Sequence, residues 1–360
     1  MTDTAHTGPQ ECWAAHRARF NGLFQEYFTS LREDFDAPSW SRFTPACLDL
    51  LEDHSLRGGK RLRVAVLYEA GRLVTDEHPP ALDAAALSIE LLQTHGLIHD
   101  DIIDDGPVRR GGPSTYYAYR AKFPDRERTA LGLTVLAGDL AAFLSVQVLL
   151  SARAPAEVCR AMAVVHAQAA ADSVVGQIVD VERDFEPDAS VEILDSVTEY
   201  KTTRYSVLAP LRLGLLAAGA DFSAHDATLR RYATLCGIYE QMHDDYLDLF
   251  GDEKVVGKAT GSDIREGRRN YAVRALLDAA GPQDRALVDT ALRDQCRARE
   301  AVDTVRDMAC RLGVDQILRA RIRSVAEQAS AEAASWRGHW REPAVDFFES
   351  LPLWSMHRTL

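Results

Sequence analysis

The sequence predicts an all-α protein with a single domain, and three observations carry this prediction. Segments in which Val, Ile or Thr alternate with polar residues are scarce, so little β-structure is expected. Ala- and Leu-rich segments with apolar residues three or four positions apart fill most of the 360 residues. Gly- and Pro-containing breakers separate these segments, but no long Ser/Gly/Pro linker divides the chain. About ten or more helices around one core are therefore expected.

The expected helices follow in chain order, each lying between two breakers or losses of periodicity. Residues 1–10 are expected to be disordered. The helices before the breaker Pro79-Pro80 cover residues 11–32, 41–54 and 61–74. Those after it are apolar on several faces, which is typical of a buried centre, and cover residues 80–104, 128–153, 156–182, 191–218 and 224–249. The last three cover residues 272–280, 283–312 and 315–337, and the polar, Gly-containing segment 251–270 is expected to be a functional or mobile loop.

Composition and charge limit the classes of function. The chain is 46% hydrophobic and 26% charged, which is ordinary for a globular protein. Its 41 basic and 54 acidic residues give a net charge of −13, which argues against a general nucleic-acid-binding protein. Phosphorylated small molecules stay possible ligands, because carboxylates bind them through a bridging metal ion.

The cellular compartment predicted from the sequence is the cytoplasm. The six cysteines are far apart and form no CxxC pair, so they are expected to be reduced. No basic region followed by an apolar run is visible near the N-terminus. The segment Leu131–Leu150 is apolar enough to resemble a membrane span, but Asp139 lies near its middle. A charge at a bilayer centre is costly, so we expect a buried core helix and no membrane span.

Two aspartate clusters are the most informative feature. Asp100, Asp101, Asp104 and Asp105 follow an apolar helix, and residues four apart share a helix face. The same His-Asp-Asp-x-x-Asp pattern returns at 243–248, again on an apolar helix. Carboxylates this close repel one another, so a cation is expected to neutralise each set. Oxygen-only ligands favour Mg²⁺ or Ca²⁺ over zinc, and Mg²⁺ of this kind usually completes its shell with substrate phosphate.

Basic residues that suit phosphate stand beside turns and at helix starts. Gly58-Gly59-Lys60-Arg61-Leu62-Arg63 begins a helix, where free N–H groups and the helix dipole favour an anion. Arg109-Arg110 lies on the turn after the first aspartate cluster. Lys201-Thr202 interrupts an apolar helix, and Lys258 follows Gly257 in the loop after the second cluster. Together these residues predict a site for more than one phosphate group.

The order of these motifs over residues 56–277, with Gly176-Gln177-x-x-Asp180 between them, resembles the trans-isoprenyl diphosphate synthases, the polyprenyl synthetase family. The resemblance implies the isoprenoid-synthase helical bundle, normally a homodimer. It also implies an Mg²⁺-dependent prenyltransferase that joins isopentenyl diphosphate to an allylic diphosphate, head to tail, giving a linear all-trans prenyl diphosphate.

The resemblance also implies roles for individual residues. Asp100, Asp101, Asp104, Asp244 and Asp248 are expected to bind about three Mg²⁺ ions on the allylic diphosphate, which Arg109, Lys201 and Lys258 contact directly. Lys60, Arg63, Arg110 and Gln93 are expected to bind isopentenyl diphosphate. Lys201, Thr202 and Gln241 would stabilise an allylic cation through their carbonyl groups, and Gln177 and Asp180 would support them. Three residues depart from the family pattern: Glu240 replaces an aromatic residue, Arg268 a lysine and Asn270 a threonine.

Product length is expected to depend on His95 and Gly96, about 6–7.5 Å along the helix from Asp100. In the family, bulky aromatics at these two places end the pocket early and give short products. Gly96 leaves the pocket open and His95 closes it moderately, so C20 geranylgeranyl diphosphate is expected, with C15 or C25 and longer as alternatives. Phe143 or a neighbour is a candidate for a deeper floor. Two other functions stay open, a class I terpene cyclase on the same fold and a non-catalytic regulatory subunit.

Overall fold

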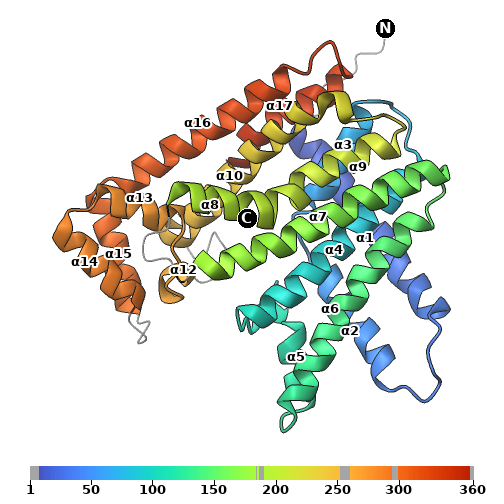
Figure 1. Cartoon of the computed structure of the whole chain (residues 1–360), viewed down its shortest axis with the longest axis horizontal. Helices are drawn as coiled ribbons and strands as arrows, with labels where there is room; N and C mark the ends of the chain where they lie inside the picture. Colours follow the sequence, from blue (N-terminus) through green and yellow to red (C-terminus); the bar gives the residue numbers. More distant parts are fainter. Residues whose placement is uncertain (1–7, 184, 186–189, 252–259, 294–298, 357–360) are drawn as a thin grey trace. The chain divides into compact units, whose positions relative to one another are not determined.

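The computed structural model describes residues 8–183, 185, 190–251, 260–293 and 299–356, and it confirms the all-α class. Helices make up nearly all of these residues (Figure 1), and the strands that they include form one short antiparallel hairpin. The elements of the first half are α1 Pro9–Asp34, α2 Phe43–Leu56, α3 Leu62–Arg72, α4 Pro80–Ile103, β1 Val108–Arg109, β2 Gly112–Pro113, α5 Thr115–Lys122, α6 Glu127–Leu150 and α7 Ala156–Arg183.

The second half combines two long helices, α10 of 25 residues and α16 of 21 residues, with shorter ones. Its elements are α8 Val191–Val197, the π-helix η1 Thr198–Leu208, α9 Ala209–Ala217, the 3₁₀ turn η2 Ser223–His225, α10 Asp226–Phe250, α12 Ser262–Arg265, α13 Tyr271–Ala279, α14 Pro282–Arg293, α15 Arg299–Arg311, α16 Val314–Ala334 and α17 Glu342–Met356. The chain forms two compact units, residues 1–170 with 209–223 (unit 1) and residues 171–208 with 224–360 (unit 2). The single domain stays a prediction.

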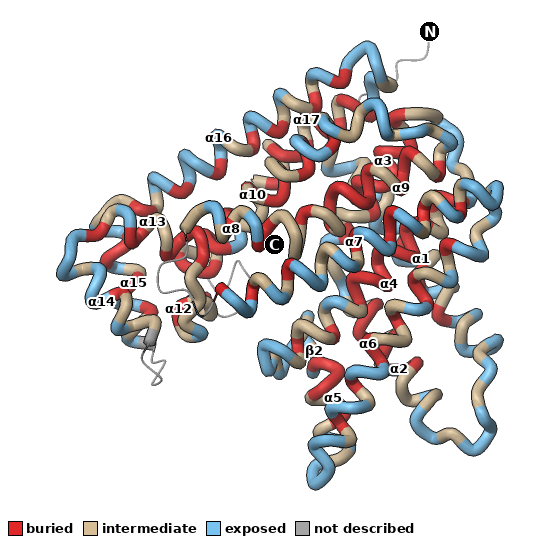
Figure 2. The backbone as a smooth tube through the Cα atoms, viewed as in Figure 1, coloured by how far each residue is buried: buried red, intermediate tan, exposed pale blue. Residues whose placement is uncertain are grey.

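Unit 1 is built around α4, which α3, α6 and α9 contact. Figure 2 shows the middle of α4 almost entirely buried, because its Ala, Leu and Ile residues face packed neighbours on every side. Glycines allow the helices to approach closely. A Cβ on Gly214 of α9 would lie 2.2 Å from the Leu67 carbonyl oxygen of α3. The tight packing fixes the end of α4, where the first aspartate cluster lies.

Unit 2 is built around α10, which packs against η1, α16 and α17. Tyr232, Trp336 and Phe348 form an aromatic core whose ring centroids are 5.0–5.7 Å apart. Phe347, Phe348 and Leu351 are buried, which confirms that this C-terminal segment serves packing. The sequence prediction missed α17 itself, because Pro352 and several aromatics obscure its helical period.

The predicted helices are found with four differences. The predicted helix 191–218 divides into α8, η1 and α9, and the predicted helix 283–312 appears as α14 and α15, with residues 294–298 outside the described residues. The prediction missed the short α5 and α12, which have too few turns to show a period. Pro9 and Gln10 already belong to α1, so the predicted disorder of residues 1–10 is wrong for these two, while residues 1–7 lie outside the described part.

The prediction of a buried core helix for Leu131–Leu150 is correct for one face only. The inner face of α6 presents small residues such as Ala137, Gly138 and Ala141, which lie buried against α4. The outer face exposes Leu136 and Phe143, at 62% and 74%. Among the described residues α6 is the one helix long and apolar enough to cross a membrane, which by itself is weak support for a span.

Candidate active site

The first aspartate cluster ends α4, and the β1–β2 hairpin folds back over it. Asp101 is buried, and its Oδ1 accepts hydrogen bonds from Arg109 Nε, at 2.8 Å, and from Arg109 Nη2. Burial raises the pKa of Asp101 although the guanidinium opposes the rise. The other oxygen, Oδ2, is buried and has no hydrogen-bond partner among the residues that the structure describes. An orphaned buried carboxylate oxygen is costly unless a donor or a cation binds it.

The remaining carboxylates of this cluster are open to solvent. Asp104 is the C-terminal cap of α4 and is exposed, and Asp100, one turn earlier, is half-buried. With the orphaned Asp101 Oδ2 they make an oxygen-only donor set, which fits Mg²⁺. The structure therefore brings together the three predicted ligands of α4.

The glycine-rich segment before α3 forms a turn, and α3 starts at Leu62, one residue after the predicted start at Arg61. Gly58 and Gly59 adopt φ values of 55° and 152°, and the second is open to glycine alone. Arg61 is buried, and its guanidinium binds Glu90 and, at 2.6 Å, the Ser55 carbonyl oxygen. Arg61, one of the basic residues of the motif, thus makes contacts inside the protein.

The predicted isopentenyl diphosphate residues lie close together in unit 1. Arg110 Nη1 donates to the Gly58 carbonyl oxygen at 2.8 Å, which joins the hairpin to the glycine turn next to Lys60. Burial lowers the pKa of Arg110, and the positive charges of Arg61, Arg63 and Arg109 lower it further although Glu90 opposes them.

The pKa of a histidine near this turn reflects the same excess of positive charge. Burial and then Arg110, Arg109 and Arg57 lower the pKa of His54 to about 3, so this imidazole stays neutral. Gln93 is buried on α4, seven residues before Asp100. An anion of high charge is the ligand that such a concentration of guanidinium groups favours.

The chain-length positions lie where α4 meets α6. His95 Nδ1 is 3.1 Å from the Gly138 carbonyl oxygen, and burial lowers the pKa of His95. Gly96 is exposed, and a Cβ built there would meet nothing within 4 Å. Phe143 points outward from unit 1, so no floor is formed by it within this unit.

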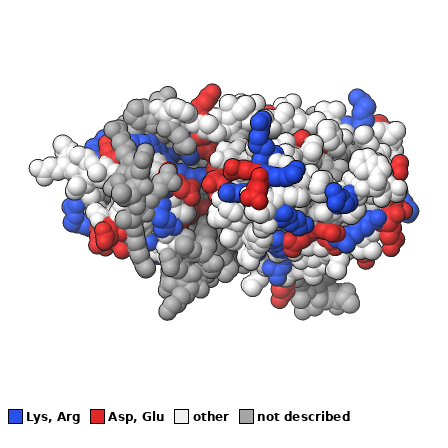
Figure 3. Space-filling view, turned by 90° about the horizontal axis from the view of Figure 1, so that it is seen from below, with Lys and Arg blue, Asp and Glu red and all other residues white. Residues whose placement is uncertain are grey.

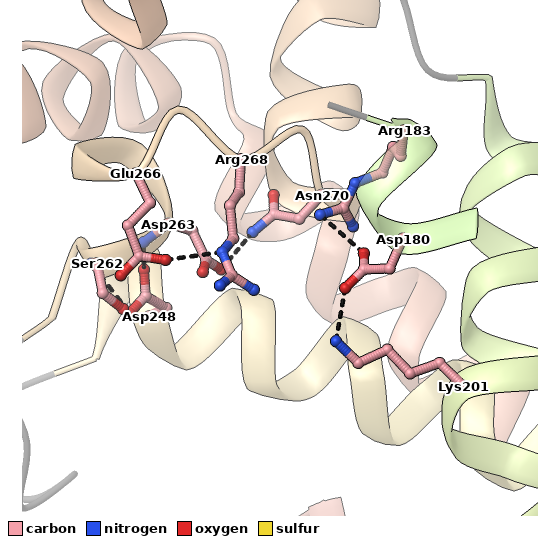
Figure 4. Close-up of polar contacts among 9 residues, drawn as sticks. All are labelled: Asp180, Arg183, Lys201, Asp248, Ser262, Asp263, Glu266, Arg268 and Asn270. Atoms are coloured by element: carbon pink, nitrogen blue, oxygen red, sulfur yellow. Dashed lines mark hydrogen bonds and ion pairs between the residues drawn. The ribbon is translucent and has the colours of Figure 1, made fainter. Parts of the chain in front are cut away.

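The cationic residues of unit 2 form a charged network that Figure 4 shows. Lys201 Nζ lies 2.5 Å from Asp180 Oδ2, and Arg183 Nη2 lies 2.9 Å from Asp180 Oδ1. Burial would raise the pKa of Asp180, but Lys201 and Arg183 lower it overall. Gly176 allows this approach, since a Cβ there would lie 2.0 Å from the Lys201 backbone nitrogen.

Lys201 and Thr202 stand within η1, the π-helix that replaces the predicted α-helix. Widened turns of this kind are rare in proteins overall, but those that occur are often found at functional sites. Thr203 Oγ1 donates to the Thr198 carbonyl oxygen, five residues earlier, at 3.1 Å, and Gly237 of α10 leaves room for this side chain. The unusual backbone thus coincides with the predicted Lys-Thr motif.

The second aspartate cluster differs from the first in how its carboxylates are used. Asp244 is exposed, whereas Asp245 and Asp248 are buried. Asp248 accepts hydrogen bonds from Ser262 Oγ at 2.6 Å and from Asp263 N at 3.0 Å, so it holds the start of α12 (Figure 4). Because both oxygens of Asp248 already accept hydrogen bonds from α12, its role as a magnesium ligand stays a prediction.

Asp245 was not assigned a role from the sequence. It accepts hydrogen bonds from Gln241 Nε2 at 2.8 Å and from Tyr271 N at 2.9 Å. Burial raises the pKa of Asp245, and the nearby Asp263 raises it further. Burial and Asp248 likewise raise the pKa of Asp263.

Within unit 2 a cavity of about 160 Å³ brings several of these groups together. Lys201, Thr202 and Gln241, predicted as one functional set, line it with Asp245 and Arg268. Asn270 caps α13 and donates to Asp263 Oδ2 at 2.6 Å, so the departures at 268 and 270 are accommodated. Sequence reasoning missed Arg183 and Asp263, although the Asp180–Arg183 helix spacing was a usable signal. Lys258 lies outside the described residues.

Charged side chains of both signs lie side by side on the face drawn in Figure 3, so the net charge of −13 does not make a uniformly negative surface. Local pairing, as at Asp101–Arg109 and Asp180–Lys201, brings the two signs together. Such a surface suits a small anion bound together with a cation.

Comparisons with known proteins agree with this chemistry. A model of the polyprenyl synthetase family matches residues 45–309. Farnesyl diphosphate synthase of Escherichia coli is 29% identical over 277 residues, which cover 75% of this chain and 88% of that protein. Geranylfarnesyl diphosphate synthase of Aeropyrum pernix is 30% identical over 306 residues, which cover 78% and 90%.

A solved structure matches almost the whole chain. The crystal structure of geranylgeranyl pyrophosphate synthase from Corynebacterium glutamicum, complexed with isoprenyl diphosphate and magnesium, has a TM-score of 0.84 at 25% identity and covers 95% of this chain and 98% of that one. The three relatives are named for products of different lengths, so the comparisons agree on prenyl diphosphate synthesis and leave the chain length open.

Proposed function

The chain belongs to the polyprenyl synthetase family of prenyltransferases, and from this premise we propose that it condenses isopentenyl diphosphate with an allylic diphosphate to C20 geranylgeranyl diphosphate. We infer that the aspartates of each cluster are Mg²⁺ ligands, with about three ions per active site. The observation that carries the proposal is in unit 1, where Asp101 and Arg109 are joined, and Arg110 and the Gly58 turn form a separate basic site. A condensing enzyme needs two diphosphate sites, whereas a cyclase needs one.

The side chains would divide the work of the reaction. Bound Mg²⁺ neutralises the leaving diphosphate, which makes carbon–oxygen ionisation possible. Arg109, already oriented by Asp101, would hold a diphosphate in unit 1. Lys201, already oriented by Asp180, would contact a diphosphate in unit 2. Arg110, Lys60 and Arg63 would fix isopentenyl diphosphate so that its alkene lies near the allylic carbon. The departed diphosphate would remove the final proton, so no side-chain base is needed.

Product length follows from the space beside Gly96. Because nothing lies within 4 Å of a Cβ there, the growing chain would pass this turn of α4 and reach C20. The test is product analysis of purified protein with Mg²⁺, isopentenyl diphosphate and each of the C5, C10 and C15 allylic diphosphates. We expect a linear C20 alcohol after dephosphorylation. A C15 or C25 product would overturn the length but keep the enzyme class.

The same assay separates the two other functions. A terpene cyclase would release a cyclic hydrocarbon without isopentenyl diphosphate. A regulatory subunit would consume neither substrate when assayed alone. Both aspartate clusters and the Gly58 turn are intact, which favours condensation over either alternative.

A homodimer is proposed from the outer face of α6. Leu136, Phe143 and Leu150 are exposed there by 62%, 74% and 61%, which is unusual for large apolar side chains on one helix. We infer that a second copy covers this face, in the cytoplasm as the sequence predicts. Light scattering of the eluted protein should give twice 39.8 kDa, and Phe143→Glu should shift it toward the monomer. A monomeric wild-type protein would contradict the proposal.

A further inference from the structure

Two imidazoles and a carboxylate meet in unit 1 where α4 packs against α6. His95 and His99 lie one turn apart on α4, and Asp139 of α6 lies beside them. One possible ligand atom from each residue lies within 4.8 Å of the other two, and the two imidazole centroids are 4.5 Å apart. No substrate-binding role described above uses the three groups together.

Neighbouring backbone orients these side chains. His95 Nδ1 lies 3.1 Å from the Gly138 carbonyl oxygen, which can only accept, so this nitrogen carries the proton. Nε2 of the neutral ring then keeps its lone pair. Proteins fix metal-binding histidines in this way, with the second ring nitrogen donating to a carbonyl or carboxylate.

Gly138 also makes the space that the cluster needs. A Cβ at this position would lie 2.4 Å from His99 Nε2, so any other residue would displace the ring. With glycine there, His99 Nε2 lies 3.7 Å from Asp139 Oδ1 and 3.4 Å from the Val135 carbonyl oxygen, a long contact that a bound cation would replace. Ligand atoms of a tetrahedral zinc site, with bonds of about 2.0 Å, are roughly 3.3 Å apart. A small side-chain movement therefore suffices for this pair to share a cation.

We propose that His95, His99 and Asp139 bind one divalent cation of the zinc class. Two histidines and a carboxylate are a known zinc donor set, which leaves a fourth position for water. Nitrogen donors separate this site from the oxygen-only aspartate clusters, because Mg²⁺ favours oxygen and imidazole suits Zn²⁺ or Co²⁺. The three side chains are partly exposed, so a cation can enter from solvent.

The site would also affect chain length, a consequence that rests on the proposed function. His95 is a chain-length position, and Gly96 beside it opens the path that the growing chain would take. A cation with its water on this turn would occupy part of that path. Enzyme loaded with Zn²⁺ should therefore release a larger share of products shorter than C20.

Binding is tested without substrates, in excess Mg²⁺ that occupies the aspartate clusters. Co²⁺ serves as the probe, because tetrahedral Co²⁺ absorbs visible light far more strongly than octahedral Co²⁺, and Zn²⁺ should displace it. We expect one strongly absorbing Co²⁺ per chain. His95→Gln and Asp139→Asn should each lower the affinity by at least about 10-fold. The matched control is His78→Gln, which removes another histidine that contacts a carboxylate, Asp83 at 2.8 Å, and should leave the affinity unchanged.

The two parts of the proposal fail separately. Octahedral Co²⁺ spectra, or equal affinity in wild type, His95→Gln and Asp139→Asn, would overturn the metal site. Tight binding with a product ratio that ignores Zn²⁺ would overturn the effect on length. In Asp139→Asn the product ratio with and without Zn²⁺ should be the same. Absence of any condensation in zinc-free, Mg²⁺-containing buffer would instead refute the proposed function and leave the binding result intact.

Discussion

The two aspartate clusters share one sequence pattern but differ in what neutralises their buried carboxylate. Each places its second aspartate inside, Asp101 at 1% and Asp245 at 3% exposure. Asp101 is paired with the guanidinium of Arg109, whereas Asp245 accepts hydrogen bonds from the neutral Gln241 side chain and the Tyr271 backbone. The same motif therefore holds an ion pair in unit 1 and a carboxyl group bound by neutral donors in unit 2, and burial raises the pKa of both carboxyl groups.

The third position of the motif differs as well. Asp104 is exposed at the end of α4, and Asp248 is buried and holds α12. Among the predicted ligands, the first cluster thus has two carboxylates that are at least partly open to solvent, Asp100 and Asp104, and the second has one, Asp244. One motif can supply cation ligands in both places while its inner residues serve different structural needs.

The largest expected effect comes from removing the first carboxylate of each cluster. Asp100→Asn and Asp244→Asn should each lower kcat/KM by about 10³-fold, because losing a metal ligand removes several kcal/mol of charge stabilisation. Steady-state assays at saturating Mg²⁺ measure this loss. Asp105→Asn, at the one aspartate of the first cluster that is not a predicted metal ligand, is the control and should change kcat/KM by less than about 3-fold. Full activity of Asp244→Asn would show that the second cluster binds no catalytic cation.

The ion pair between Asp101 and Arg109 in the first cluster should contribute to stability. Arg109→Gln leaves the Asp101 carboxylate buried without its cation, which should lower the free energy of unfolding by about 2–3 kcal/mol. This value is below that of a fully buried pair, because the Arg109 side chain is 32% exposed. Urea unfolding measures the change. In the double variant Arg109→Gln/Asp101→Asn, a good part of the lost stability should be regained. Equal losses of stability in the single and the double variant would mean that the pair contributes nothing.

The buried Asp245 carboxyl group of the second cluster should make the stability of the fold depend on pH. The pKa of Asp245 is raised above its unfolded value of about 3.9. The folded state then binds more protons, so stability falls as pH rises above about 4. Asp245→Asn stays neutral, so its stability relative to wild type should rise by about 1 kcal/mol between pH 5 and pH 8. Unfolding at several pH values with a metal chelator tests this, and parallel curves would contradict it.

The sequence predicted the helical class, both clusters and the glycine turn, because these depend on local period and on charges adjacent in the chain. It could not predict that Arg61 turns inward to Glu90 or that Asp248 holds α12, since both partners lie far apart in the sequence. The π-helix η1 was missed for a related reason. A widened turn has the same composition as an α-helix, and tertiary contacts such as Gly237 against Thr203 accompany it.

Substitutions one turn before a cluster are expected to change activity and stability least, but to change the product length clearly. On α4 this position is Gly96, which is open, whereas α10 has Glu240 there, next to the buried Tyr239. Gly96→Phe should fill the open space and shift the product from C20 toward C15, with kcat/KM for the first condensation nearly unchanged. Gly96→Ala is the matched control: it should keep the product and raise stability by about 0.5–1 kcal/mol, since alanine favours a helix interior. Unchanged product from Gly96→Phe would show that the chain grows along another face of α4.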